Sequence, residues 1–253
     1  MPELVTSLVG EVLVVTITRP EKRNAVNRDV AQGIADAMEL LDDDGDVRAA
    51  VLTGAGGHFS AGMDLRAFAT GERPHVEGRG FGGLVERPPR KPLIAAVEGY
   101  ALAGGLELAL ACDLIVAARD ARFGLPEVRR GLVPAAGGLL RLPALIPRGA
   151  ALELVLTGEP ISGERAFELG LVTRMTEPGG ALGAAIELAT AIAAGAPLAT
   201  AAAKRIMLES PGWPPAEAWA RQREIADPVI GSQDAREGAR AFAEKRAPSW
   251  QGR

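Results

Sequence analysis

The chain is poor in cysteine, histidine and aromatic residues. It has one cysteine among 253 residues, so no internal disulfide can form, and Cys112, in an apolar stretch, is expected to be a small core residue. Its two histidines, His58 and His75, have no partners at metal-ligand spacing. These shortages exclude a disulfide-stapled scaffold and predict no metal site.

The chain also lacks an excess of basic residues and a long apolar run. Its formal charge is −4, with 28 basic and 32 acidic residues interspersed, so we expect neither nucleic acid nor an anionic membrane as a partner. The start lacks the features of a secretory signal. In the alanine-rich stretch 181–203, Glu187, Gly195 and Pro197 interrupt the roughly 18 apolar residues that a membrane span needs. A cytoplasmic protein without a membrane anchor is expected.

What is present is an alternation of short apolar strands and helices around one core. Helical spacing of apolar residues runs from Val30 to Leu41, and a short helix is expected to begin near Gly104. Strands are predicted over 12–18, 49–53, 93–97 and 114–118. This pattern predicts an α/β core built from repeated ββα or βαβ units over residues 1–195.

The end of the chain has a different, wholly helical pattern over residues 196–253. Helices are predicted over 198–209, 215–226 and 232–245, the last with Ser232 as its N-cap. Such helices bury little by themselves. We expect them to pack on the core or on another subunit.

Residues 70–90 contain five glycines and three prolines, and no regular element is expected there. A long loop inside a compact domain is often a binding loop or a lid. The alternative is a mobile surface loop.

Two glutamates are the strongest chemical signal. Glu107 lies in the glycine-rich segment 99–109 and Glu127 in 122–131, and the apolar surroundings of both would raise the pKa of a carboxyl group. Such a group carries protons near neutral pH. The alternatives are a Glu107 at a solvated helix start and a Glu127 paired with a neighbouring arginine. The turn 59–64 follows a strand and offers further backbone N–H groups to an oxyanion.

With these residues in place, the whole chain resembles the enoyl-CoA hydratase (crotonase) superfamily. Within it, segments 80–84, 139–143 and 241–253 look closest to the carnitinyl-CoA dehydratase (crotonobetainyl-CoA hydratase) branch. That branch typically has Pro-Asp-Ser-Gly-Gly where this chain has Pro134-Ala135-Ala136-Gly137-Gly138. The matching motifs are Arg19-Pro20 with Asn24-Ala25, Phe59 to Gly62, Gly104 to Glu107, Phe123 to Glu127, Gly137-Gly138, and Phe242 to Arg246.

The resemblance implies a ClpP-like ββα spiral core with a helical C-terminal trimerisation segment, assembled as a homotrimer or a dimer of trimers. It implies a hydro-lyase that adds water reversibly to a trans-2-enoyl-CoA, with no cofactor beyond the coenzyme A of its substrate. Glu107 and Glu127 would transfer the protons. The N–H groups of Ala61 and Gly104 would hold the thioester oxygen.

The resemblance also implies how coenzyme A is held. One segment would border the pantetheine and phosphates, a second would lie near the adenine, and a C-terminal pair would reach the nucleotide of a neighbouring subunit. These residues are Arg23 and Ala25, the backbone of Met63, Asp64 and Leu65, and Phe242 with Lys245.

Three other functions stay open. A carnitinyl-CoA-type dehydratase would bind a quaternary ammonium, which favours aromatic cages, and the chain is only 4% aromatic. Enoyl-CoA isomerases of the family usually do not keep both glutamates. A non-catalytic, RNA-binding relative would need a basic stripe that the acidic chain lacks.

Overall fold

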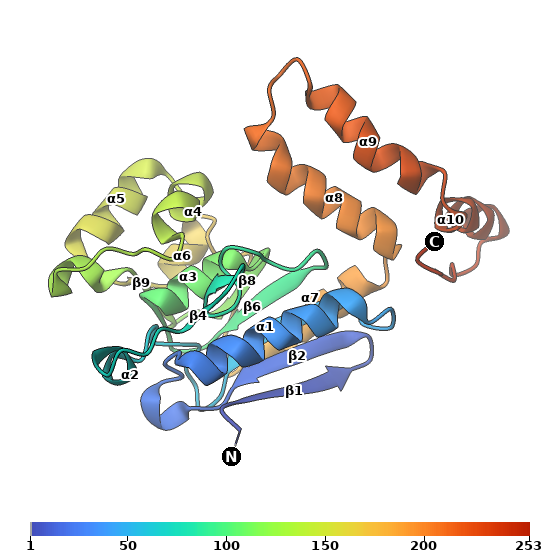
Figure 1. Ribbon diagram of the computed structural model, residues 1–253. Helices are drawn as coiled ribbons and strands as arrows, with labels where there is room; N and C mark the ends of the chain where they lie inside the picture. Colours follow the sequence, from blue (N-terminus) through green and yellow to red (C-terminus); the bar gives the residue numbers. More distant parts are fainter. Residues whose placement is uncertain (1) are drawn as a thin grey trace.

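The computed structural model describes residues 2–253, and the part described contains a six-stranded main sheet with the strand order β1-β2-β3-β6-β8-β11 (Figure 1). β1 and β2 pair antiparallel, and every later neighbour pairs parallel. The strands are β1 (Leu4–Val9), β2 (Val12–Ile17), β3 (Ala49–Gly54), β6 (Leu93–Val97), β8 (Leu114–Ala118) and β11 (Arg174–Thr176).

Both faces of the main sheet are covered, as the continuous apolar runs of its parallel strands require. Successive residues of β3 point to opposite faces of the sheet. Leu52 packs in the apolar cluster that contains α1 (Arg28–Asp43), and Val51 packs in the cluster that contains α7 (Ala181–Ala193). The buried side chains of α7 are alanines at every fourth position, which lets this helix lie close to the sheet.

A second sheet, β10-β9-β7, explains how distant residues meet. β7 (Tyr100–Leu102) follows β6 and leads into α3 (Gly104–Ala111), and β9 (Arg122–Gly124) follows β8 and leads into the 3₁₀ helix η2 (Pro126–Arg130). β7 and β9 pair in parallel. The chain thus leaves the main sheet twice in the same direction and places the starts of α3 and η2 side by side, which is the predicted ββα repeat.

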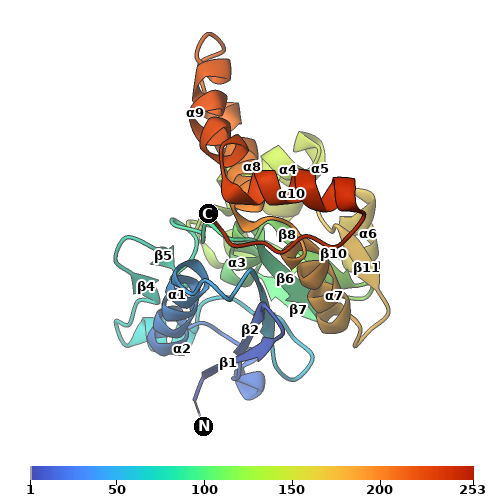
Figure 2. The same cartoon turned by 90° about the vertical axis from the view of Figure 1, so that its right-hand side faces the viewer.

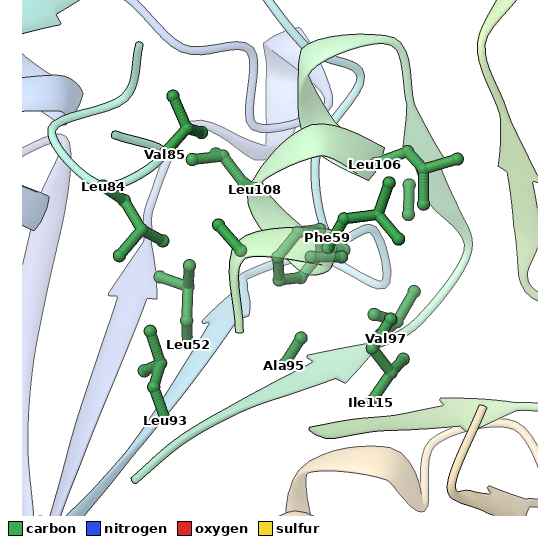
Figure 3. Packing of buried hydrophobic residues seen from close by; sticks show 14 of the residues in the cluster. Leu52, Phe59, Leu84, Val85, Leu93, Ala95, Val97, Leu106, Leu108 and Ile115 are labelled. Carbon is green, nitrogen blue, oxygen red and sulfur yellow. The ribbon is translucent and has the colours of Figure 1, made fainter. Parts of the chain in front are cut away.

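The core lies between the main sheet and α3, whose residues are all buried. Figure 3 shows Phe59, from the turn after β3, among side chains of α3 and of the sheet. Its labelled neighbours include Leu106 and Leu108 of α3 and Ala95 and Val97 of β6. The Phe59 turn is therefore anchored by its aromatic ring beneath the helix that carries Glu107.

The segment 70–90 corrects one expectation. It follows α2 (Leu65–Ala69) and contains a small hairpin of β4 (His75–Val76) and β5 (Gly80–Phe81), where the sequence pattern predicts no regular element. Phe81, Leu84 and Val85 are buried in the main core, so the second half of this segment is folded into the body. Its glycines serve turns, and Gly83 comes so near the Ala31 carbonyl that a Cβ atom would clash with it.

The region between β9 and α7 holds elements that the apolar pattern did not reveal. Its helices are short, one of them contains Pro143, and their apolar faces are weakly separated from their polar faces. They are α4 (Gly138–Leu145), α5 (Arg148–Thr157), β10 (Ile161–Ser162) and α6 (Gly163–Glu168). The first of them supports the candidate active site.

The C-terminal helices are α8 (Pro197–Glu209), η3 (Ser210–Gly212), α9 (Ala218–Ile230) and α10 (Gln233–Glu244). The Ser232 hydroxyl accepts the Ala235 N–H, which confirms the predicted cap. Figures 1 and 2 show α8 and α9 as a hairpin that stands away from the main sheet. The Lys204 ammonium ties α8 to the body by donating to Asp113 at 2.7 Å and to two backbone carbonyls. The domain division at 195/196 stays a prediction.

No single helix within residues 2–253 is long and apolar enough to cross a membrane; α7 and α8 reach that length only as a pair bent by 109°.

Candidate active site

A cavity of about 310 Å³ opens where the turn after β3, the start of α3 and the segment after β9 meet. Both predicted proton carriers, Glu107 and Glu127, line it. Its walls are otherwise mostly apolar, with three basic side chains. The remaining lining residues are Ala61, Met63, Leu65, Phe68, Arg73, His75, Phe81, Ala103, Gly104, Arg130, Leu132, Val133, Ala135 and Ala136.

The start of α3 presents an unpaired backbone donor to this cavity. Ala103, the N-cap, has φ 51° and ψ −129°, a strained conformation for a residue with a side chain. The Ala103 N–H donates to the Gly124 carbonyl at 2.8 Å. The Gly104 N–H, the first of the helix, has no acceptor within residues 2–253. A Cβ atom at Gly104 would lie 2.5 Å from the Phe81 ring, so a larger residue would force that buried ring to shift.

The turn from Phe59 to Asp64 supplies a second donor, but not the one predicted. The Ala61 N–H donates to the Arg23 carbonyl at 2.9 Å, so the expectation that it holds a thioester oxygen is wrong. In the bridge to Val26, the Gly62 carbonyl and the Asp64 N–H both face Val26. The N–H groups of successive residues in extended backbone point in opposite directions. Because the Asp64 N–H points toward Val26, the Met63 N–H points away from Val26.

The Met63 N–H has no acceptor in the described part of the chain, and Met63 lines the cavity. A Cβ atom at Gly62, which has φ 91°, would lie 2.9 Å from the Gly104 nitrogen, so the two turns adjoin. The free N–H groups of Met63 and Gly104 are therefore neighbours. The sequence predicts this turn but not which of its N–H groups is free, because the bond from Ala61 to Arg23 is a tertiary contact.

Glu107 is 3% exposed and fixed by the start of α4. Its Oε1 accepts the Ala136 N–H at 2.7 Å and the Gly138 N–H at 2.9 Å. Burial raises the pKa of Glu107, and these two bonds and the Arg141 charge oppose that rise. The solvated helix-start alternative is wrong, since the side chain is buried. The Gly137-Gly138 motif marks this segment in the sequence, but the pattern does not reveal its two donors to Glu107.

Glu127 has one oxygen without a partner. It is 9% exposed, and its Oε2 atom is buried with no hydrogen bond within residues 2–253. The pKa of Glu127 is raised to about 7, chiefly by burial; the nearby Glu107 charge also raises it, whereas a backbone hydrogen bond and the Arg130 charge lower it. The alternative of a salt bridge to Arg129 or Arg130 is wrong, because Arg129 pairs with Glu159 and no ion pair joins Glu127 to Arg130 within residues 2–253.

The Glu127→Gln variant is expected to be more stable than the parent protein at alkaline pH. A buried acid with a raised pKa stabilises the fold fully below its unfolded pKa of about 4.5 and loses that contribution as pH rises through about 7. Glutamine cannot ionise, so it removes a cost of at most about 3 kcal/mol. Thermal melts near pH 8.5 should show the gain and melts near pH 5 should not. An equal shift at both pH values would contradict the raised pKa.

The predicted coenzyme A residues divide into two groups. Met63 and Leu65 line the cavity, whereas Arg23 does not line it and is exposed, with its guanidinium 5.4 Å from the centre of the Tyr100 ring. The Ala25 carbonyl accepts a bond from Arg19. The Asp64 carboxylate pairs with Arg19 at 2.9 Å and caps α2, so its side chain has a structural role.

Phe242 and Lys245 lie at the end of α10 and do not line this cavity. A contact with the nucleotide of a neighbouring subunit stays a prediction for this pair.

The fold and this site place the chain in a known class of enzymes. A family model described as enoyl-CoA hydratase/isomerase matches residues 9–253, and the chain belongs to that family. The chain is 58% identical to an enoyl-CoA hydratase from Mycobacterium marinum, with a TM-score of 0.98 and 100% of each chain covered.

Relatives with another name match as well. The chain is 44% identical to a carnitinyl-CoA dehydratase from Salmonella typhi over 96% of each sequence. It is 43% identical to the solved carnitinyl-CoA hydratase from Mycobacterium avium, with a TM-score of 0.80 and 100% of each chain covered. These matches confirm the predicted family, the crotonase fold and a hydratase-type enzyme.

Proposed function

We propose that the protein adds water reversibly and in the syn sense to a trans-2-enoyl-CoA, giving a 3-hydroxyacyl-CoA. The observation that carries this proposal is the meeting of two buried glutamates and two unpaired backbone N–H groups in one cavity. Hydration needs both kinds of group. The N–H pair stabilises charge on the thioester oxygen, and the carboxyl pair moves two protons.

The N–H groups of Met63 and Gly104 hold the thioester oxygen as enolate charge develops. Both are fixed by the fold before substrate arrives, Gly104 by the strained Ala103 peptide and Met63 by the bridge to Val26. Such donors need no reorganisation during the reaction, and each is typically worth about 3 kcal/mol in the transition state.

Glu107 and Glu127 bind the reacting water between them and divide the proton transfers. Two backbone bonds to Glu107 favour its ionised form, which accepts a proton from the water as the oxygen attacks C3. Glu127, with its pKa raised to about 7, retains a proton and delivers it to C2. The two carboxyl groups interact, so their titration belongs to the pair.

Assembly and nucleotide binding extend the proposal. The C-terminal helices expose large apolar side chains, with Met207 at 75%, Trp219 at 71% and Phe242 at 88%, as expected of surfaces that meet another copy of the chain. A homotrimer, or a dimer of trimers, would bring Phe242 and Lys245 to the coenzyme A nucleotide of a neighbour, beside its Arg23 and Ala25. A cytoplasmic location belongs to the same proposal.

A panel of trans-2-enoyl-CoA esters from C4 to C16, with crotonobetainyl-CoA included, tests the reaction. We expect loss of the enoyl absorbance with the uncharged esters. Turnover of crotonobetainyl-CoA alone would favour the carnitinyl-CoA dehydratase reaction instead. Double-bond migration without water addition would favour an isomerase, which the presence of both glutamates argues against.

A further inference from the structure

Two arginines on the cavity wall have no acidic partner. Arg73, after α2, and Arg130, at the end of η2, both line the cavity. Within residues 2–253 neither forms an ion pair, and the bonds of Arg73 go to the backbone carbonyls of Phe68 and Glu72. Arg129, next in sequence to Arg130, differs because it pairs with Glu159 and donates to the Thr157 carbonyl.

The cavity has no acidic side chain that would serve only to balance the charges of Arg73 and Arg130. Among the described residues that line it, only Glu107 and Glu127 are acidic, and both are assigned to proton transfer. Arg130 lies close enough to Glu127 to lower the pKa of that carboxyl group. Its charge therefore acts near the reacting carbons of the acyl chain. The nucleotide phosphates are separated from those carbons by the whole pantetheine arm.

The two phenylalanine rings that line the cavity each already have a partner. The Arg73 guanidinium lies 4.0 Å from the centre of the Phe68 ring, so it already occupies the position that a quaternary ammonium would take. Phe81 meets His75 edge to face, with ring centres 5.9 Å apart. A trimethylammonium group would meet two unpaired guanidinium charges and no free aromatic cage.

We propose that this cavity selects enoyl-CoA esters whose acyl chain ends in a carboxylate, and that Arg73 and Arg130 bind that carboxylate. The inference rests on the proposed hydration and names its substrate class. Arginine is suited to this task, because its planar fork donates two bonds to one carboxylate. The apolar lining from Leu65, Leu132 and Val133 accommodates the methylene groups between the two ends.

The test compares kcat/KM for three esters: trans-5-carboxy-2-pentenoyl-CoA, the uncharged trans-2-hexenoyl-CoA and the cationic crotonobetainyl-CoA. Both arginines are exposed to solvent, which weakens each ion pair, so we expect the carboxylate ester to be preferred over the uncharged one by about 2- to 30-fold. The cationic ester should be the poorest of the three. Arg73→Met and Arg130→Met should each lower the carboxylate preference by up to about fivefold.

Arg129→Met is the matched control, because it removes the same charge from the adjacent position outside the cavity. It should leave the preference at the parent value. In the ratio of kcat/KM for the carboxylate and uncharged esters, any effect of Arg130 on Glu127 cancels, and so does any contact with coenzyme A itself.

Three outcomes separate the possibilities. Hydration of all esters without a carboxylate preference would overturn the substrate class and leave the hydratase function intact. An equal loss with the carboxylate and uncharged esters in the arginine variants would overturn the role of these arginines in binding the acyl carboxylate. Hydration of none of the esters would instead contradict the proposed function.

Discussion

Glu107→Gln and Glu127→Gln are each expected to lower kcat for enoyl-CoA hydration by about 10²- to 10⁴-fold, the usual contribution of general acid–base transfer. Glutamine keeps the size of the side chain but can neither accept nor deliver the proton. The affinity for the coenzyme A ester should change little, because the thioester is held by backbone groups. Steady-state kinetics and calorimetric binding measure the two effects separately.

Glu164→Gln is the control for both variants, since Glu164 is exposed in the first turn of α6 and does not line the cavity. It should retain parental turnover. If either cavity variant also kept near-parental turnover, that glutamate would not transfer a proton in the rate-determining step, and its role here would have to be withdrawn.

Replacing the Met63 residue by its α-hydroxy acid analogue should lower kcat by about 10²- to 10³-fold. The substitution turns the Gly62–Met63 peptide bond into an ester, which keeps the side chain, removes the N–H group and makes the Gly62 carbonyl a weaker acceptor for the Val26 N–H. This N–H has no acceptor within residues 2–253, so the free energy of unfolding should fall only through the weaker Val26–Gly62 bond, by less than about 1 kcal/mol. Kinetics and a denaturant titration on the same sample test both statements.

The same exchange at Ala61 is the matched control and should have the opposite pattern. The Ala61 N–H donates to the Arg23 carbonyl, so its loss should cost about 1 kcal/mol of stability and affect kcat far less. A larger loss of kcat at position 61 than at position 63 would restore Ala61 as the oxyanion donor and exclude Met63.

The sequence was most informative where apolar periodicity and buried strands coincide. The strands 93–97 and 114–118 match β6 and β8, and the helix predicted from Val30 to Leu41 lies within α1. These elements are long or wholly apolar, so local pattern and tertiary burial agree. The helices of 138–168 escaped prediction because short helices with mixed faces lack a clear periodicity.

The candidate site shows the same division. Glu107, Glu127 and Gly104 could be selected from the sequence, because charge in an apolar segment and glycine before a helix are local signals. Met63 as a donor, and the Ala136 and Gly138 groups that hold Glu107, could not. Their roles depend on which backbone groups remain unpaired after distant segments meet, and sequence pattern does not record that.

Arg73 and Arg130 belong to this second group as well. In the sequence they are two of many scattered basic residues, and Arg130 is indistinguishable from Arg129 beside it. The fold separates them, since Arg129 finds Glu159 whereas Arg130 faces the cavity.

The most direct test of the proposed chemistry is the hydration of crotonyl-CoA in D₂O, with the product analysed by NMR. In the proposed reaction, one water between Glu107 and Glu127 supplies the hydroxyl group, and Glu127 delivers the proton to C2. The product should then carry one deuterium at C2 on the same face as the C3 hydroxyl. Repeated dehydration and rehydration should preserve that configuration, because the same deuterium is removed and returned. Deuterium on the opposite face, an equal mixture of both configurations, or no hydrated product would contradict hydration by this pair of glutamates.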